Sequence, residues 1–209
     1  SGQQKGRPAH DIPENESFPL PYTEDFENYN AGVTPKYLAD MQGTFEISQC
    51  KGGREGKALE QILPDLGVNL WEYTGKEPPQ AMTMFGETHW RDYEITSDVF
   101  IEEGSVYLSV RKGATQDLTG YAFVIDKQGS WKIVFDNVIE EAAILEKGSV
   151  TPFDSQKWHN IKIRCINDKI KVYLDSKLVS IVEHAGRKTG QPCLGGSFDL
   201  NQFDNLSVK

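Results

Sequence analysis

The feature that most constrains the fold of this chain is a two-residue hydrophobic period that returns in segment after segment. In a β-strand, successive side chains point to opposite faces, so a strand with one buried face alternates apolar and polar residues. The segments with this pattern are YEITSDVFIE (93–102), SVYLSVRKG (105–113), GYAFVIDKQ (120–128), SWKIVFDN (130–137), AAILEKG (142–148) and the long run 157–184. Their apolar positions are rich in β-branched and aromatic residues, which favour strands. Helical periodicity is weak throughout, and VIEEAAILEK (138–147) comes nearest to it, so the sequence predicts an all-β chain.

Short turn sequences separate these strands. EG (103–104), KQG (127–129) and ND (167–168) stand where antiparallel hairpins would place their turns. We therefore expect a sandwich of two antiparallel sheets, each with one face buried against the other. The run that begins at Trp158 and turns at 167–168 and again at 175–176 resembles the recurring hairpin of concanavalin A-like and laminin-G proteins. The expected fold is thus a concanavalin A-like/laminin-G jelly-roll sandwich.

Length and composition limit the domain organisation. The 209 residues, 38% of them hydrophobic, suffice for one sizeable core. Residues 1–20 are polar and interrupted by prolines, which predicts a tail or linker, whereas residues 21–209 predict the folded domain. Three cysteines are too few for a disulfide scaffold. No stretch approaches the roughly 20 apolar residues of a membrane span.

The charge balance limits the classes of partner. The formal net charge is −9 and the isoelectric point is about 5.0. Binding to phosphate groups requires clustered lysine and arginine side chains, and here the basic residues are scattered among acidic ones. These features argue against a nucleic-acid or anionic-membrane partner and leave neutral or cationic ligands open.

Several sequence blocks, taken in order, resemble the C-terminal lectin-like domain of the galactocerebrosidase family. The blocks are EDF (24–26), LADMQGTFE (38–46), LEQIL (59–63), WRDYEITSDVFIE (90–102), GSF (196–198) and QFDN (202–205). In that family, catalysis belongs to a separate α/β barrel with paired glutamates. The resemblance implies an accessory domain that recognises a carbohydrate, such as a galactoside or a glycolipid headgroup, beside a catalytic barrel domain. It also implies a secreted, periplasmic or lysosomal-type compartment.

Acidic residues near both ends of the folded region suggest a calcium site. Asp25 and Glu27 are two apart in a predicted strand, so their carboxylates leave on the same face. First and last strands of jelly rolls are often neighbours, which would bring Asp204 close, and calcium prefers such oxygen ligands. The family resemblance implies a calcium ion held by Asp25, Glu27, the carbonyl of Lys57 and Asp204, with Glu27 standing where the family has asparagine. The plainer interpretation is that the first two residues are solvated and that Asp204 caps a turn.

Aromatic residues are the candidates for contact with a sugar. Trp71 and Tyr73 lie in the irregular stretch NLWEYTGKEPPQ, and an aromatic residue on a loop over a rigid scaffold is a common ligand platform. Trp158 begins a strand, and we expect it in the core. The four histidines show no metal-ligand spacing, and no nucleophile motif is present.

Three functions are consistent with these sequence features. The favoured one is a non-catalytic, calcium-stabilised carbohydrate-recognition domain. The first alternative is a stand-alone glycoside hydrolase, which would need two carboxylates about 5 to 10 Å apart on one sheet, and adjacent pairs such as Glu102 and Glu103 point to opposite faces of a strand. The second alternative is a structural or protein-binding module of the laminin-G type. The sequence identifies no catalytic carboxylate pair and therefore does not decide between an enzyme and a binding domain.

Overall fold

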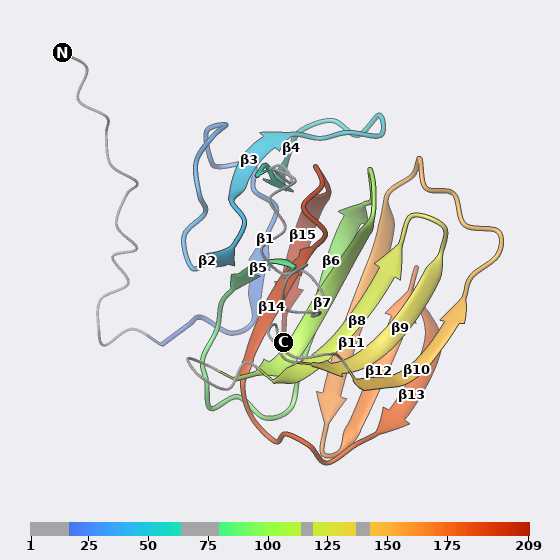
Figure 1. Ribbon diagram of the computed structural model, residues 1–209. Coiled ribbons are helices and arrows are strands. Elements are labelled where there is room, and N and C mark those ends of the chain that lie inside the picture. The colour runs from blue at the N-terminus through green and yellow to red at the C-terminus, as the bar shows by residue number, and fades with distance from the viewer. Residues whose placement is uncertain (1–16, 64–79, 114–118, 137–142) are drawn as a thin grey trace, which may run out of the picture.

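The computed structural model describes residues 17–63, 80–113, 119–136 and 143–209. These residues form fifteen β-strands and no helix, arranged as two antiparallel sheets packed face to face (Figure 1). The predicted all-β sandwich of two antiparallel sheets is therefore confirmed. None of the described segments forms a helix long and apolar enough to cross a membrane.

The two sheets divide the strands as follows. Sheet A contains β1 (Tyr22–Glu24), β3 (Phe45–Gln49), β4 (Lys57–Gln61), β6 (Tyr93–Phe100), β11 (His159–Ile166), β12 (Lys169–Leu174), β13 (Lys177–Glu183) and β15 (Gln202–Val208). Sheet B contains β2 (Ala39–Gln42), β5 (Ala81–Met84), β7 (Ser105–Lys112), β8 (Gly120–Asp126), β9 (Ser130–Asp136), β10 (Ala143–Ser149) and β14 (Gln191–Gly196). The strand order is β13-β12-β11-β6-β15-β4-β3 in sheet A, with β1 also paired to β15, and β10-β9-β8-β7-β14-β5-β2 in sheet B.

The main core lies between the sheets, where the alternating strands place their apolar faces. On sheet A, Ile95 and Ile163 are cross-strand partners and both are fully buried. On sheet B, Leu108 and Phe123 are likewise partners and fully buried. Burial of such side chains contributes about 1.5 to 3 kcal/mol each, so the period of two in the sequence supplies most of the stability of the fold.

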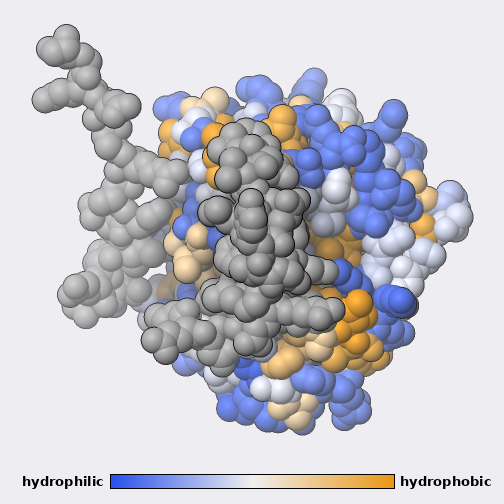
Figure 2. Space-filling view, viewed as in Figure 1, coloured by the Kyte–Doolittle hydropathy of each residue, from blue (hydrophilic) through white to orange (hydrophobic). Residues whose placement is uncertain are grey.

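A second apolar cluster lies on sheet B, on the face turned away from sheet A. Its buried members are Met82, Met84, Tyr107, Ala122, Val134 and Cys193. In the space-filling view, hydrophilic residues line much of the edge of the visible face (Figure 2). Hydrophobic residues are visible inside this edge. The central strands of sheet B are thus apolar on both faces, which a simple alternation with one solvated face does not predict.

The two ends of the described chain lie side by side in sheet A. β1 pairs antiparallel with β15, with Tyr22 opposite Val208 and Glu24 opposite Leu206. Just before β1, Phe18 packs edge-on against Tyr22, with ring centroids 4.9 Å apart. Its backbone N–H donates to the Glu87 carboxylate at 2.9 Å. The neighbourhood of first and last strands that the jelly-roll interpretation predicts is confirmed.

One predicted hairpin is wrong. β6 and β7 flank the turn at 103–104, but they belong to different sheets, so the chain crosses between the sheets there. The Asn201 side-chain oxygen accepts hydrogen bonds from the backbone N–H groups of Glu102 and Glu103 at 2.7 and 3.2 Å, which holds the crossing in place. A side chain at Gly104 (φ +62°) would meet Ser197 at 2.2 Å, so the glycine is needed for close approach. The turns at 127–129 and 167–168 do join paired strands, as predicted.

Candidate functional site

Two carboxylates lie directly opposite each other on the outer face of sheet A. Asp98 on β6 and Asp204 on β15 are cross-strand partners. Like charges in this position repel one another. Arg54, from the loop between β3 and β4, resolves the conflict, because its Nη1 donates to Asp98 Oδ2 at 2.9 Å and to Asp204 Oδ2 at 3.0 Å. The result is a half-buried charge cluster of one guanidinium and two carboxylates.

The indole ring of Trp158 stacks on the Arg54 guanidinium. The Arg54 guanidinium lies 4.1 Å from the centre of the indole ring, within range of a cation–π interaction. The indole N–H donates to the Lys51 carbonyl at 2.8 Å, which fixes the ring over the loop. Trp158 is therefore a half-buried residue of the outer surface, and the expectation that it lies in the core is wrong. It precedes β11, where the chain has not yet entered the alternation of the strand.

Two asparagines, Asn160 and Asn205, donate further hydrogen bonds to the two carboxylates. Asn160 Nδ2 donates to Asp98 Oδ1 at 3.0 Å and Asn205 Nδ2 donates to Asp98 Oδ2 at 2.9 Å. The Asn205 backbone N–H donates to Asp204 Oδ1 at 2.8 Å. Asn205 has a φ of +49° and lies where the register of β15 shifts, so a β-bulge aims these groups outward. This explains why acidic residues stand so close to the core positions Phe203 and Leu206.

Burial governs the electrostatics of this cluster. The side chain of Asp204 is only 7% exposed. Burial raises the pKa of the Asp204 carboxyl above its usual value, and the hydrogen bonds from Arg54 and Asn205 lower it without cancelling the effect. Burial also raises the pKa of the nearby Cys50 thiol to about 11; the Asp204 charge adds to this shift and Arg54 opposes it. Cys50 is thus a protonated, unreactive thiol at neutral pH.

The two acidic residues predicted near the start of the fold do not lie in a strand, which corrects the prediction. β1 ends at Glu24, and Phe26 has a φ of +63°. The Glu24 carboxylate accepts the Phe26 N–H at 2.7 Å, and Asp25 Oδ1 accepts the Glu27 N–H at 3.1 Å. Side chains that hydrogen-bond the backbone two residues on favour a turn over an extended strand.

The structure brings two of the four predicted calcium ligands into contact. Glu27 Oε1 accepts the backbone N–H of Lys57 at 2.9 Å. A side chain at Gly56 would approach this carboxylate to 2.4 Å, so the glycine (φ +93°) makes room for Glu27. Glu27 and Asp204 both raise the pKa of the Cys50 thiol, which places them in the same neighbourhood. The hydrogen bond that Asp25 accepts lies within its own turn.

The donor set has the right chemistry for calcium but is not assembled. Carboxylate and carbonyl oxygens are the ligands that calcium prefers. However, Asp204 Oδ2 is bound to Arg54 and Glu27 Oε1 is bound to a backbone N–H. Within the described ranges, no three His, Cys, Asp or Glu side chains are grouped so as to hold a metal ion. The cation that neutralises Asp204 in this structure is Arg54.

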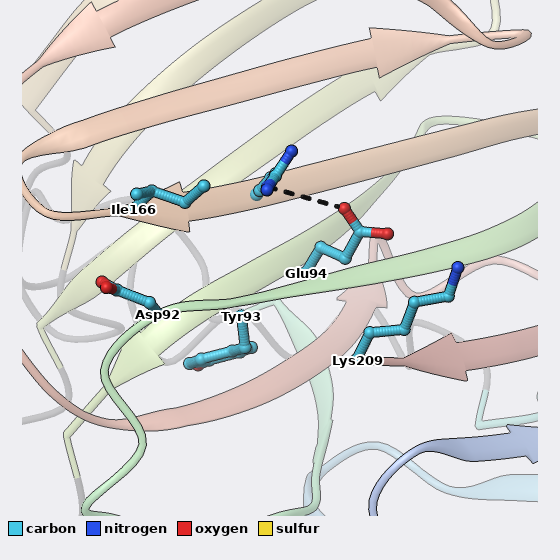
Figure 3. A pocket seen from close by; sticks show the side chains of 6 residues that line it. Asp92, Tyr93, Glu94, Ile166 and Lys209 are labelled. Carbon is cyan, nitrogen blue, oxygen red and sulfur yellow. Dashed lines mark ion pairs between the residues drawn. The ribbon is translucent and has the colours of Figure 1, made fainter.

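A hollow of about 490 Å³ lies farther along the outer face of sheet A (Figure 3). It is lined by Asp92, Tyr93, Glu94, Arg164, Ile166 and Lys209. Figure 3 shows the side chains of Glu94 and Lys209 extending alongside one another, and an ion pair of 3.8 Å joins Glu94 to Arg164 Nε. The hollow therefore offers cations, carboxylates and an aliphatic side chain to a polar ligand.

Sequence reasoning missed Arg54, Asp98 and the residues of the hollow. The outward positions of β11 could have been found from the alternation in IKIRCI, which leaves Lys162 and Arg164 on one face. The pairing of Arg54 with Asp98 and Asp204 has no local signal, because these residues are far apart in the chain. Trp71 and Tyr73, the predicted sugar contacts, lie outside the described residues.

The chain matches a known protein family and a curated relative. Residues 40–209 match the family described as the galactocerebrosidase C-terminal lectin domain. A curated relative, the galactocerebrosidase of Danio rerio, is 26% identical over 216 residues, a match that includes 94% of this chain. The chain spans 30% of the length of that relative.

Solved structures agree on the fold. The carbohydrate binding module CBM66 from Bacillus subtilis has a TM-score of 0.61 at 20% identity, over 83% of this chain and 95% of that one. A Bacillus subtilis protein of unknown function with a galectin-like fold has a TM-score of 0.54 at 8% identity, over 82% of this chain and 88% of that one. At these identities, the likeness shows a shared sandwich architecture and nothing more.

Proposed function

Since this chain belongs to the galactocerebrosidase C-terminal lectin domain family, we propose that it is a non-catalytic carbohydrate-recognition domain that accompanies a glycoside hydrolase. The match over residues 40–209 carries the proposal, because it extends over most of the described sandwich. The shared architecture with a carbohydrate binding module supports it. The ligand we propose is a galactoside or a glycolipid headgroup.

We further propose that a catalytic barrel domain is the partner of this sandwich. The Danio rerio relative is much longer than the matched region, so such a domain has room in a protein of this family. The proposed compartment is secreted, periplasmic or lysosomal-type, as the family resemblance suggests. In this arrangement the sandwich supplies a binding surface and the barrel supplies the chemistry.

The carboxylate pair Asp98 and Asp204 is the observation that favours the hydrolase alternative. The two groups are close enough to share one nitrogen of Arg54, and a retaining glycosidase needs two carboxyl groups about 5 Å apart. The raised pKa of Asp204 would suit a general acid. Against catalysis, Arg54 stands between the two groups, where the glycosidic bond would have to lie. We therefore favour the non-catalytic function.

Ligand-observed NMR with β-galactosides and β-glucosides in calcium buffer, followed for a day, tests both functions. We expect saturation transfer to a galactoside without release of free sugar. New anomeric signals of free sugar would instead establish hydrolysis, and an Asp98→Asn variant that abolished them would assign it to the carboxylate pair. Absence of both signals would contradict the proposal for this chain.

The predicted aromatic contacts complete the proposed binding site. We propose that Trp71 and Tyr73 stack on the apolar face of the sugar, as aromatic side chains do in many sugar sites. The expected result of Trp71→Ala is loss of most of the saturation transfer. Trp131→Phe is the matched control, because Trp131 packs against the core with its ring 6.2 Å from Phe123.

We also propose that calcium stabilises the domain through Asp25, Glu27, the Lys57 carbonyl and Asp204. The pairing of β1 with β15 supports this, because it brings the turn that holds the first two residues to the strand that carries Asp204. Calcium would stabilise the folded state by mass action, since the unfolded chain lacks the site. Binding would require Arg54 to release Asp204 and retain Asp98 alone.

A further inference from the structure

Five cationic side chains lie on one part of the outer face of sheet A, which we call the basic strip. They are Lys162 and Arg164 on β11, Lys169 and Lys171 on β12, and Lys209 after β15. The strand register places them together: Arg164 is opposite Glu94 on one side and Lys171 on the other. Lys209 is hydrogen-bonded through its backbone to Glu94, so one row across β12, β11, β6 and the residue after β15 holds three cationic side chains and one carboxylate side chain. Adjacent strands are about 4.8 Å apart, so these charges are close to one another.

The basic strip is poorly neutralised, in contrast to the half-buried Arg54 and the buried Arg111. Arg54 and Arg111 form ion pairs at 2.9 to 3.0 Å. In the strip, Lys162 and Arg164 share the single carboxylate of Glu94 at 3.9 and 3.8 Å, beyond hydrogen-bonding distance.

The other three cations of the strip are less constrained still. Among the described residues, no hydrogen bond or ion pair holds the ammonium groups of Lys169, Lys171 and Lys209. The acidic residues beside the basic strip neutralise little of its positive charge. Glu183 lies opposite Lys169 without forming an ion pair, and Asp92 is bound to Arg111. In a chain of net charge −9, such a local excess of positive charge identifies a surface for an anion.

The hollow described above lies within the basic strip, and the residues that line it limit which class of anion can bind there. Arg164 and Lys209 line it together with Glu94 and Ile166 (Figure 3). The two cations can bind an acidic group, and the arginine fork suits a planar carboxylate or a sulfate. The Glu94 carboxylate can accept hydrogen bonds from hydroxyl groups, and Ile166 can contact an apolar C–H face. An acidic sugar presents all three kinds of group at once.

We propose that the hollow and the basic strip bind an acidic carbohydrate, a polysaccharide whose sugars carry carboxylate or sulfate groups. This inference rests on the proposed carbohydrate-recognition function and names the ligand class of a surface distinct from the proposed calcium site. A single acidic sugar occupies the hollow, with its acid group on Arg164 and Lys209 and its hydroxyls on Glu94. Lys162, Lys169 and Lys171 attract the neighbouring acidic units of the chain.

An anionic bilayer fits the same surface less well. A bilayer contacts residues that protrude, whereas here a carboxylate stands inside the hollow and would face the phosphate groups. Leu178 and Ile181, 52% and 47% exposed on the edge strand β13, are the residues that would enter a bilayer. They lie three strands away from Glu94, so the test can separate them from the hollow.

Calorimetric titration of the purified chain with polygalacturonate, chondroitin sulfate and neutral galactan tests the inference. We expect binding to one or both acidic polymers that weakens with added salt. Arg164→Ala is expected to weaken it about tenfold, as loss of a charge-assisted contact does. Lys147→Ala removes the same charge from the exposed strand β10 of sheet B and should leave binding unchanged. Equal weakening by both variants would overturn the inference.

Glu94→Ala separates sugar recognition from attraction by charge alone. If Glu94 accepts hydroxyl groups of the sugar, the variant binds the acidic polymer several-fold more weakly. If the strip acts only through its net charge, removal of a carboxylate strengthens binding, and the inference is wrong. It is equally wrong if phosphatidylserine vesicles bind the chain more tightly than the polymers do and a Leu178→Ser/Ile181→Ser variant abolishes that binding.

The neutral ligands distinguish failure of this inference from failure of the proposed function. Saturation transfer to β-galactosides without any binding of acidic polymers would overturn the inference and leave the carbohydrate-recognition function intact. Silence toward neutral and acidic carbohydrates alike would overturn both. Circular dichroism of each variant verifies that the fold is retained.

Discussion

At the residue scale, the coexistence of Asp98 and Asp204 depends on one guanidinium. The two side chains are 18% and 7% exposed, so neither is fully solvated. Removal of one partner from a buried ion pair leaves an uncompensated charge, which costs far more than the intact pair contributes. Arg54 is the partner that both carboxylates share.

Arg54→Ala is expected to lower the free energy of unfolding by about 2 to 3 kcal/mol at pH 7, because it strands two carboxylates and removes the stack on Trp158. Urea denaturation measures the change. Arg164→Ala, which removes an arginine with a single long ion pair on the same face, is the matched control and should cost less than about 0.5 kcal/mol. Similar losses for the two variants would contradict this role of Arg54.

The stability of the wild-type protein should depend on pH through Asp204. Its folded-state pKa is raised, so the folded chain binds a proton more tightly than the unfolded chain does. The contribution is therefore fully present below the ordinary value of 3.8 and is lost as the pH rises through the raised pKa. Arg54→Ala raises that pKa further, so the gap between variant and wild type should widen from pH 4 upward. A gap that is constant with pH would exclude this account.

Calcium binding has a test at the same scale. We expect calcium to raise the melting temperature of the wild type and to leave that of Asp204→Ala at its value in chelator, because the variant lacks a central ligand. Scanning calorimetry in calcium and in chelator measures the increment. Glu183→Ala removes an exposed carboxylate from β13 and should retain the full increment. A calcium increment that survives in Asp204→Ala would show that the site is misplaced.

At the scale of elements, the turn between β12 and β13 contains one residue that is held by tertiary contacts and one that carries backbone strain. Asp175 and Ser176 both have positive φ, at 48° and 67°, as a tight type I′ hairpin requires. Asp175 Oδ1 accepts the Asn160 N–H at 2.9 Å and Oδ2 lies 2.8 Å from His159 Nδ1. These contacts tie the turn to the start of β11, whereas Ser176 carries the strain without a comparable contact.

Ser176→Gly is expected to stabilise the protein by about 0.5 kcal/mol, because glycine adopts positive φ without steric cost. The greater backbone entropy of glycine in the unfolded chain offsets part of this stabilisation. Chemical denaturation measures the difference. Ser207→Gly, the same change in the extended strand β15, should instead destabilise by about 0.5 to 1 kcal/mol. Destabilisation by both changes would show that backbone strain at Ser176 is negligible.

At the scale of the whole molecule, the sandwich is closed by its own chain ends. β15 lies between β6 on one side and β4 and β1 on the other. Phe18 and Tyr22 join an aromatic cluster with Tyr37 and Trp90 beneath this junction. Contacts between the first and last strands span most of the sequence, so they add stability only after the rest of the fold has formed.

A chain that begins at Asp25 should melt about 10 °C lower than one that begins at Ser17. The buried Tyr22, the half-buried Phe18 and the β1 ladder contribute about 3 to 5 kcal/mol, and 1 kcal/mol corresponds to roughly 2 to 4 °C for a protein of this size. Thermal unfolding followed by circular dichroism measures both. Removal of residues 1–16 is the control and should change little, because the sequence predicts a tail there. Equal melting temperatures for the two shortened chains would contradict a closing role for β1.

Much of the fold was predictable because the pattern that reveals it is local. The alternation of residues 93–102 and 157–184 predicts β6, β11, β12 and β13 and identifies which side chains face outward. The turns at 167–168 and 175–176 follow from Asn167 and Asp175, whose residue types tolerate positive φ. The turn at 103–104 has the same local signal, yet it crosses between sheets, because Asn201 binds its backbone from far along the chain.

By itself, the sequence determined an all-β sandwich, the resemblance to a lectin domain and the acidic residues near both ends, since composition and period are properties of neighbouring residues. Only the tertiary structure decided that Asp98 faces Asp204 with Arg54 between them, that Asp25 and Glu27 lie in a turn, and that five cations share one face of sheet A. The physical reason is that charge pairing depends on which strands become neighbours and in which register. A two-residue period fixes the face on which a side chain lies, but not the charge it will meet there.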